Sequence, residues 1–156
     1  DQLPPMMDYN IRHGRTYMYL KGKPLYAFGY GLSYTTFRYK NLRLSSPGMT
    51  ASGAVTVSVD ITNTGRRAGD EVVQMYVQHL DSKVERPARE LEGFQRISLA
   101  AKETRTVQMR LPALQLAYWD VAGHSFRVEP ERVRLLVGSS SDDIRLHGTV
   151  RVTQGR

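Results

Sequence analysis

The chain has 156 residues, of which 40% are hydrophobic and 24% are charged, with a net charge of +7 and no cysteine. This length suits one domain with a sizeable core, and the composition is typical of a globular protein. The lack of cysteine excludes disulfide bonds, and no run approaches the ~18 apolar residues of a membrane-spanning helix, so we expect no membrane partner. Because the sequence begins with Asp1 and not with methionine or a leader, we expect a fragment of a longer protein.

Residues 1–36 are rich in aromatic side chains and interrupted by glycine and proline. Seven of the nine tyrosines fall within the first 39 positions, namely Tyr9, Tyr17, Tyr19, Tyr26, Tyr30, Tyr34 and Tyr39. The segment is too short and irregular for a core of its own, yet so much aromatic area in water would be unfavourable at ~25 cal/mol per Å². We therefore expect an irregular arm that docks either on another domain or on the rest of this chain.

From about Thr36 onward, apolar and polar residues alternate with the period of two that is typical of half-buried strands. The alternation is clearest at 55–62 and recurs at 73–77, 107–111, 133–137 and 144–152. Turn sequences separate these runs at 46–48, 63–65, 122–124 and 138–143. Only 112–116 could form a single helical turn, so crossover helices are missing from the pattern. The pattern predicts an all-β fold, an antiparallel β-sandwich over residues 37–156.

The positive charge is spread thinly along the chain. Arginines alternate with apolar residues, as at Arg132, Arg134 and Arg145, which is typical of strand positions that face solvent. Aromatic and basic residues also interleave between Tyr17 and Lys40, as they do in platforms for single-stranded nucleic acid. We favour solvent-facing strand positions and expect no nucleic-acid partner.

Four stretches carry a more specific signal. They are Gly14–Tyr17 with Gly22–Phe37, Gly69–Val77, Arg86–Phe94 and Val137–Ile144. The first resembles the junction that closes the second catalytic domain of family 3 glycoside hydrolases, and the others resemble the fibronectin type III-like domain that follows it. Ala27 departs from the family pattern, which usually has proline there, and this should loosen the arm slightly.

The resemblance implies that residues 37–156 form an immunoglobulin or fibronectin type III-like sandwich, and that 1–36 are the end of the preceding α/β catalytic domain and a linker arm. It also implies a parent enzyme of the β-glucosidase or β-xylosidase type, a retaining hydrolase whose catalytic Asp and Glu lie upstream of Asp1. The segment would then be a non-catalytic accessory domain, periplasmic or secreted, that stabilises the catalytic domains of the same polypeptide. We expect it to use no metal and no cofactor.

Candidate contacts with the catalytic domains come from two places. In the arm they are the aromatic residues Tyr26, Phe28, Tyr30 and Tyr34. In the sandwich, the polar loop 81–87 is long for a strand connection, and long loops tend to carry contacts. Arg86 is the expected contact there, because its guanidinium can pair with a carboxylate or carbonyl across an interface.

Three carboxylate pairs could be considered for catalysis: Asp70 with Glu71, Glu129 with Glu131, and Asp142 with Asp143. Neighbouring residues of a strand point to opposite faces, and we expect the other carboxylates in exposed turns where nothing raises a pKa. We therefore expect none of them to be catalytic.

The remaining candidates are histidines and one tryptophan. The histidines at 13, 79, 124 and 147 lack metal-ligand spacing, so we expect them on the surface. Trp119, beside Tyr118 and Asp120, could stack on a sugar ring, although a single tryptophan is more often part of the core. The alternative function is therefore a free-standing carbohydrate-binding module for an oligo- or polysaccharide.

Overall fold

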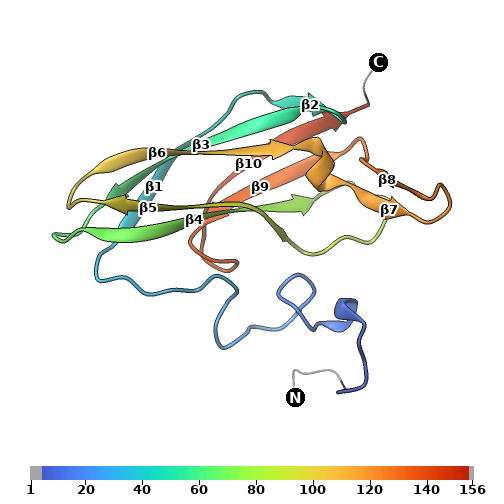
Figure 1. Cartoon of the computed structure of the whole chain (residues 1–156), viewed down its shortest axis with the longest axis horizontal. Helices are drawn as coiled ribbons and strands as arrows, with labels where there is room; N and C mark the ends of the chain where they lie inside the picture. Colours follow the sequence, from blue (N-terminus) through green and yellow to red (C-terminus); the bar gives the residue numbers. More distant parts are fainter. Residues whose placement is uncertain (1–4, 155–156) are drawn as a thin grey trace.

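A computed structural model describes residues 5–154, in which a β-sandwich follows an irregular N-terminal arm, residues 5–36 (Figure 1). The elements are η1 (Ile11–His13), β1 (Phe37–Leu44), β2 (Gly48–Thr50), β3 (Ala54–Asn63), β4 (Gly69–His79), β5 (Glu90–Leu99), β6 (Thr104–Pro112), η2 (Ala113–Leu116), β7 (Tyr118–Asp120), β8 (Ser125–Arg127), β9 (Arg132–Gly138) and β10 (Ile144–Thr153). One sheet has the order β1-β3-β6, the other has the order β2-β10-β9-β4-β5, and β7 and β8 form a separate hairpin. The predicted antiparallel β-sandwich is confirmed, with one parallel pairing between β2 and β10.

The core lies between the two sheets and consists of the apolar residues that alternate in the sequence. On β3, the inward residues Val55, Val57, Val59 and Ile61 are at most 1% exposed. Inward residues of the other strands of both sheets, together with Ala113 and Leu116 of η2, belong to the same apolar cluster. Full burial of each such side chain contributes about 1.5–3 kcal/mol, so this period-two pattern is enough to specify the two layers.

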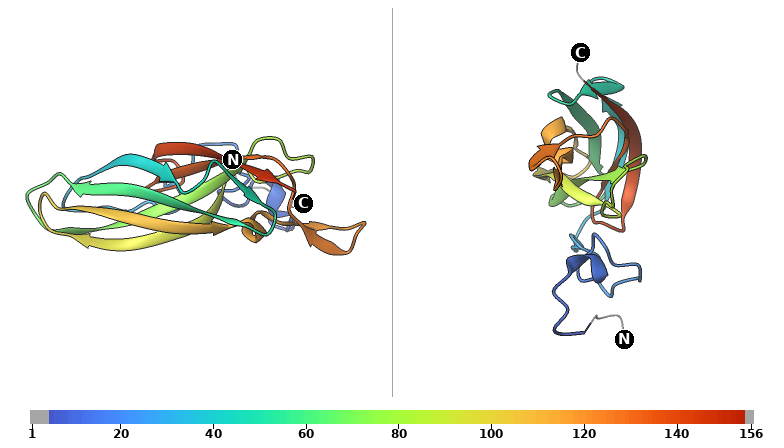
Figure 2. Two further views of the ribbon diagram at one scale, coloured as in Figure 1. Left: turned by 90° about the horizontal axis from the view of Figure 1, so that it is seen from above. Right: turned by 90° about the vertical axis from the view of Figure 1, so that its right-hand side faces the viewer.

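Strand β4 is buried on both of its faces. Val73, Met75 and Val77 face the other sheet, whereas Gln74 and Tyr76 point to the opposite side and are buried as well. The arm covers that opposite side: it runs along one flank of the sandwich in Figure 1 and lies apart from the second sheet in the end view of Figure 2. The outer face of the five-stranded sheet is therefore partly an interior surface.

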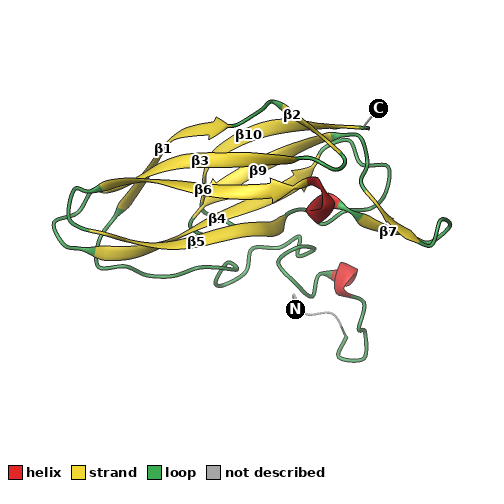
Figure 3. Cartoon of the chain, turned by 45° about the horizontal axis from the view of Figure 1, so that its top comes forward, coloured by secondary structure: helices red, strands yellow, loops and turns green. Residues whose placement is uncertain are grey.

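The arm itself contains little regular structure. Figure 3 shows it as loop apart from one turn, η1, whose first residues are capped by the Asn10 side chain accepting from the Arg12 amide. Within residues 5–154, no helix has the length and apolar character needed to cross a membrane.

The runs named from the sequence did not include β1, β2, β5 or the β7–β8 hairpin. On β5 the alternation is broken by a bulge, because Met75 pairs with Gly93 and Tyr76 pairs with Leu91, which leaves Glu92 as an extra residue. Strands β7 and β8 have three residues each and are too short to show a period, although the turn between them was recognised. The predicted helical turn at 112–116 is confirmed as η2.

Candidate functional site: an aromatic docking surface

An aromatic stack fixes the arm to the sandwich. The ring of Tyr17 stacks on Phe28 with centroids 4.1 Å apart and planes 11° apart, and it meets Tyr76 of β4 edge-on at 6.1 Å. Offset stacks and edge-on contacts are the favoured aromatic geometries and add about 0.5–1.5 kcal/mol to the burial of area. The Tyr17 hydroxyl also accepts a hydrogen bond from the Leu91 amide at 2.9 Å. Tyr17 thus ties the arm to two strands.

Gln74 is the polar centre of the same contact. Its Nε2 donates to the carbonyl oxygens of Gly29, at 3.1 Å, and Ser139, at 2.6 Å, while its Oε1 accepts from the Tyr76 hydroxyl. A second arm carbonyl, that of Phe28, accepts from the Ser141 amide at 2.9 Å. The arm therefore supplies one of the partners of this buried amide.

Gly29 is required where the arm meets Gln74. Its φ of +78° lies in the left-handed region, and a Cβ atom would lie 2.2 Å from Gln74 Oε1. Glycine avoids both the strain and the clash. Gly29, the first glycine of the Gly-Tyr-Gly stretch, thus allows the arm to approach β4 closely.

A buried asparagine fixes the end of the arm where the chain enters β1. Asn63, at the end of β3, is 0% exposed and accepts a hydrogen bond from Thr35 Oγ1 at 2.6 Å and one from the Gly65 amide at 3.0 Å. Its Nδ2 donates to the Arg67 and Leu99 carbonyl oxygens at 2.8 and 3.1 Å. One side chain therefore connects the arm, the β3–β4 turn and the end of β5.

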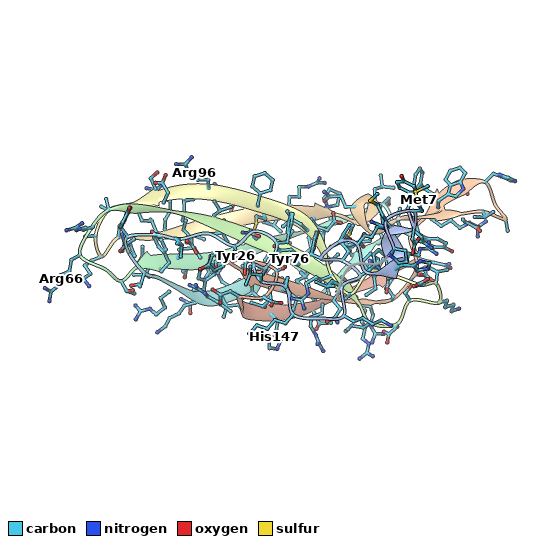
Figure 4. All side chains as sticks on the ribbon, turned by 90° about the horizontal axis from the view of Figure 1, so that it is seen from below. Met7, Tyr26, Arg66, Tyr76, Arg96 and His147 are labelled. Atoms are coloured by element: carbon cyan, nitrogen blue, oxygen red, sulfur yellow. The ribbon has the colours of Figure 1, made fainter. Side chains whose placement is uncertain are left out.

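The arm also exposes large apolar side chains to solvent. We define the docking surface as Met6, Leu25, Tyr26, Tyr30, Leu32, Tyr34 and Phe94, all of them more than half exposed. Tyr34 is 97% exposed and Leu25 is 90% exposed, while the rings of Tyr26 and Tyr30 contact each other at 5.4 Å. Phe94 belongs here because it pairs with Gln74 and so lies on the same sheet face. Figure 4 shows the molecule from this side and labels Tyr26 near its middle. Exposed apolar clusters of this kind mark surfaces that bind another macromolecule.

The candidate contact residues do not all lie together. Tyr26, Phe28, Tyr30 and Tyr34 are in the arm as expected, with Phe28 partly used in the stack on Tyr17. Arg86, by contrast, is 9% exposed at its side chain and donates to the Leu116 carbonyl oxygen at 3.0 Å and to Glu129 at 3.5 Å. Its guanidinium also lies 5.0 Å from the Tyr118 ring centre. These bonds hold the loop against the β7–β8 hairpin, and an interdomain contact of Arg86 stays a prediction.

Trp119 lies on the β7–β8 hairpin and is 50% exposed, so the expectation that it belongs to the core is wrong. Its ring meets Phe126 edge-on at 5.2 Å with planes 73° apart. The opposite face of the hairpin carries the Asp120–Arg127 ion pair, at 2.8 Å, and Tyr118 beneath Arg86. The hairpin is thus held from one side and presents two aromatic rings on the other.

Each of the six candidate carboxylates has a partner of its own. Asp70 pairs with Arg96, Glu71 accepts from Tyr39, Glu129 accepts from Ser82, Glu131 pairs with His79, Asp142 pairs with Arg89, and Asp143 pairs with Arg145. Glu131 is 1% exposed at its side chain, and Glu129 is 11% exposed. Their expected place in exposed turns is therefore wrong. Burial also raises the pKa of Glu71, against the hydrogen bond from Tyr39 that lowers it.

His79 was expected on the surface, but its side chain is 1% exposed. Its Nδ1 lies 2.6 Å from Glu131 Oε1, and its Nε2 lies 3.5 Å from Glu90 Oε2. Burial lowers its pKa, but the two carboxylates more than offset this, so the net shift is upward. Glu92 lies close by, and burial together with the charge of Glu90 raises its pKa to about 7. We call His79, Glu90, Glu92 and Glu131 the His79 cluster. The spacing of these residues in the sequence does not indicate that they lie together.

Comparison with known proteins connects these features. Residues 71–141 match the fibronectin type III-like domain. The periplasmic β-glucosidase of Salmonella typhimurium is 41% identical over 122 residues, which are 78% of this chain and 16% of that protein. The β-xylosidase of Formosa agariphila is 42% identical over 133 residues, which are 83% of this chain and 18% of that protein. The crystal structure of β-glucosidase from Kluyveromyces marxianus in complex with glucose superposes with a TM-score of 0.79 at 38% identity, covering 88% of this chain and 16% of that one. The chain thus spans less than a fifth of each relative.

Proposed function

We propose that this chain, which contains a fibronectin type III-like domain and is similar to β-glucosidases and β-xylosidases, is the C-terminal, non-catalytic accessory domain of a family 3 glycoside hydrolase. It stabilises the catalytic domains of one longer polypeptide, which hydrolyses β-linked glucosides or xylosides. Residues 1–36 are the end of the preceding catalytic domain and its linker. The whole enzyme is periplasmic or secreted, in keeping with the periplasmic relative.

The exposed docking surface is the observation that carries this proposal. The arm is bound to the sandwich through Tyr17, Phe28 and Gln74, whereas other large apolar residues of the arm are exposed. Covering this surface with a folded domain would contribute ~25 cal/mol for each Å² of apolar area removed from water. The relatives have more than four fifths of their length outside the matched segment, so a covering domain in the same polypeptide is available in them.

The proposal is tested in the full-length enzyme with Tyr34→Ser and Leu25→Ser. Both side chains are almost fully exposed in this chain, so neither change disturbs the fold of the sandwich. We expect each to lower the melting temperature of the enzyme and to shorten the lifetime of its glycosidase activity on heating. Val121→Ser at the hairpin tip, where Val121 is 73% exposed, is the matched control. Unchanged melting and lifetime in both arm variants would contradict docking through this surface.

A second assay addresses the non-catalytic role. The 156-residue chain alone should release no nitrophenol from nitrophenyl β-glucoside or β-xyloside, because each candidate carboxylate is engaged by a partner. Turnover by the purified chain that disappears in Glu71→Gln would assign catalysis to this segment and contradict the proposal.

The exposure of Trp119 favours a second function, the binding of an oligo- or polysaccharide by a carbohydrate-binding module. Aromatic faces pack against the apolar faces of sugar rings, and Trp119 is the only tryptophan, so its fluorescence reports on this site alone. Quenching by β-linked gluco- or xylo-oligosaccharides that is lost in Phe126→Ala would support sugar binding. A flat titration would exclude it and leave the stabilising role.

A further inference from the structure

We infer that a polar pocket between the arm and the sandwich binds a neutral mono- or disaccharide. The pocket has a volume of about 350 Å³, which is at the lower end of the range of about 300–1,000 Å³ for small-molecule sites. It shares no residue with the β7–β8 hairpin. The inference rests on the proposed function only for the choice of sugar, because glucose and xylose are the units that the proposed parent enzyme would release.

Three parts of the chain form the walls of this pocket. The end of the arm and the beginning of β1, from Tyr30 to Phe37, form one wall. Glu71 near the beginning of β4 forms the second, and the turn between β9 and β10 with Arg145 forms the third. Figure 1 shows this turn extending from the sandwich towards the arm. Because the arm supplies one wall, a ligand in the pocket favours the docked arm.

Arg145 fixes the shape of the polar wall. Its Nη1 donates to the Phe37 carbonyl oxygen at 2.6 Å, and its Nη2 pairs with Asp143 Oδ2 at 2.7 Å. Its guanidinium lies 4.7 Å from the ring centre of Tyr39, and Ser139 Oγ donates to the same Asp143 oxygen at 2.6 Å. These contacts hold the polar groups in place before a ligand arrives, which lowers the cost of ordering them on binding.

Glu71 offers a carboxylate oxygen that the chain itself does not use. Its Oε1 accepts from the Tyr39 hydroxyl at 2.6 Å, whereas its Oε2 has no hydrogen-bond partner among residues 5–154. The residue is half-buried, but this oxygen is not among the fully buried polar atoms, so a ligand can reach it. A ligand that covers a carboxylate oxygen must donate to it, or the loss of water is costly. A sugar hydroxyl can make that donation.

The charges of the pocket select a neutral ligand. Glu71 and Asp143 bring two negative charges against the one positive charge of Arg145, which is already paired with Asp143. An anion such as phosphate would therefore meet an excess of negative charge. A metal ion would be repelled by Arg145, and residues 5–154 contain no group of three His, Cys, Asp or Glu side chains that could hold one. A small polyhydroxylated molecule meets neither obstacle.

Tyr30 supplies an apolar surface beside these polar groups. It lines the pocket, and it is 52% exposed. Aromatic faces pack against the apolar faces of sugar rings, while carboxylates and hydroxyls bind the hydroxyl groups at the ring edge. The hydroxyls of Ser33 and Ser139 line the same pocket. One aromatic ring, one available carboxylate oxygen and several hydroxyls thus suit a glucosyl or xylosyl unit.

The test is a titration of the ¹⁵N-labelled 156-residue chain with glucose, xylose, cellobiose and xylobiose, followed through the backbone amide shifts. We expect saturable shifts at Gly31, Glu71 and Ser140 with a dissociation constant on the order of 1 mM, the affinity of a ligand with about twelve non-hydrogen atoms. No saturable shift at the pocket with any of the four sugars at about 50 mM would overturn the inference. Shifts confined to residues 118–127 would place the sugar at Trp119 and overturn it as well.

Two variants locate the binding. Glu71→Gln keeps the shape of the side chain and an acceptor for Tyr39 but removes the charged oxygen, so we expect binding to weaken about tenfold. Tyr30→Ala removes the aromatic surface and should weaken binding about fivefold. Tyr34→Ala is the matched control, because it removes a ring from the same segment that is 97% exposed and does not line the pocket. It should bind as the wild type does.

Unchanged affinity in both Glu71→Gln and Tyr30→Ala would contradict the assignment of the site, as would a loss in Tyr34→Ala as large as that in Tyr30→Ala. If Glu71→Gln lost the dispersed spectrum of a folded protein, Tyr30→Ala would decide, because the Tyr30 side chain is more than half exposed and its removal leaves the core intact. The titration uses no catalytic domain, so its failure leaves the proposed stabilising function untouched.

Discussion

Replacing Asn63 with Ala should be one of the most damaging single changes in the sandwich. The side chain is 0% exposed and makes four hydrogen bonds, to Thr35, Gly65, Arg67 and Leu99. A buried hydrogen bond contributes about 1 kcal/mol net, and an orphaned buried partner costs more than that. Since Gly65 and Arg67 lie in a turn that water can reach, we expect a loss of about 3 kcal/mol in the free energy of unfolding.

Urea unfolding followed by far-UV circular dichroism measures this loss. With a slope of about 2 kcal/mol per M, the midpoint should fall by about 1.5 M. Asn63→Asp keeps the two acceptor contacts but places a carboxylate against two carbonyl oxygens, so it should be at least as harmful. Gln108→Ala, at an exposed position of β6, should change the free energy by less than about 0.5 kcal/mol. A loss below about 1 kcal/mol in Asn63→Ala would refute this account of the junction.

Three further predictions concern the arm contact, the core and pH. Gly29→Ala should destabilise the arm contact by about 1–2 kcal/mol through its positive φ, seen as faster tryptic cleavage after Lys21; unchanged cleavage would argue against a required glycine. Leu135→Ala, at a 0% exposed position, should cost about 2–5 kcal/mol in a urea titration, and a cost under about 1 kcal/mol would mean that the site is not part of the packed core. The raised pKa of His79 contributes stability that is fully present below its unfolded pKa, near 6.5, and is lost as the pH rises through its folded pKa. Urea midpoints should therefore fall above neutral pH, less steeply in His79→Gln, and an equal slope in both proteins would contradict this assignment.

The sandwich could be predicted because most of its strands show a clear alternation of apolar and polar residues. In β3, β6 and β9, residues that face the core alternate strictly with residues that face solvent, and the structure keeps that register. Strand β5 was not predicted because Glu92 interrupts the period-two alternation at the bulge. A single inserted residue is invisible to a periodicity argument unless the partner strand is known.

The candidate site was only partly predictable. The concentration of tyrosines in the arm indicated a docking segment, and the structure shows that Tyr17 binds this chain while Tyr26, Tyr30 and Tyr34 stay exposed. The partner of each polar group could not be foreseen, because Gln74 reaches Gly29 over 45 positions and His79 reaches Glu131 over 52. Contacts of this length depend on the order of the strands, which local pattern does not determine.

Trp119 and Arg86 illustrate the same limit. A lone tryptophan is usually buried, but Trp119 lies on a hairpin of two three-residue strands that extends beyond both sheets (Figure 1). Arg86 lies in a polar loop that reads as exposed in the sequence, yet the carbonyl oxygen of Leu116 and the ring of Tyr118 bind it inside the fold. The burial of Arg86 follows from its contacts with η2 and β7, which lie about 30 positions further along the chain.

The most direct test of the central claim compares the docking surface in this chain with the same surface in the full-length enzyme. Hydroxyl-radical footprinting reports the solvent access of individual side chains, and Tyr34, Leu25 and Met6 should react readily in the isolated chain, where each is more than four-fifths exposed. In the full-length enzyme all three should be strongly protected, while Val121 at the hairpin tip should react equally in both. Equal reactivity of the arm residues in the two proteins would contradict a role for this chain as a domain docked on its catalytic partner.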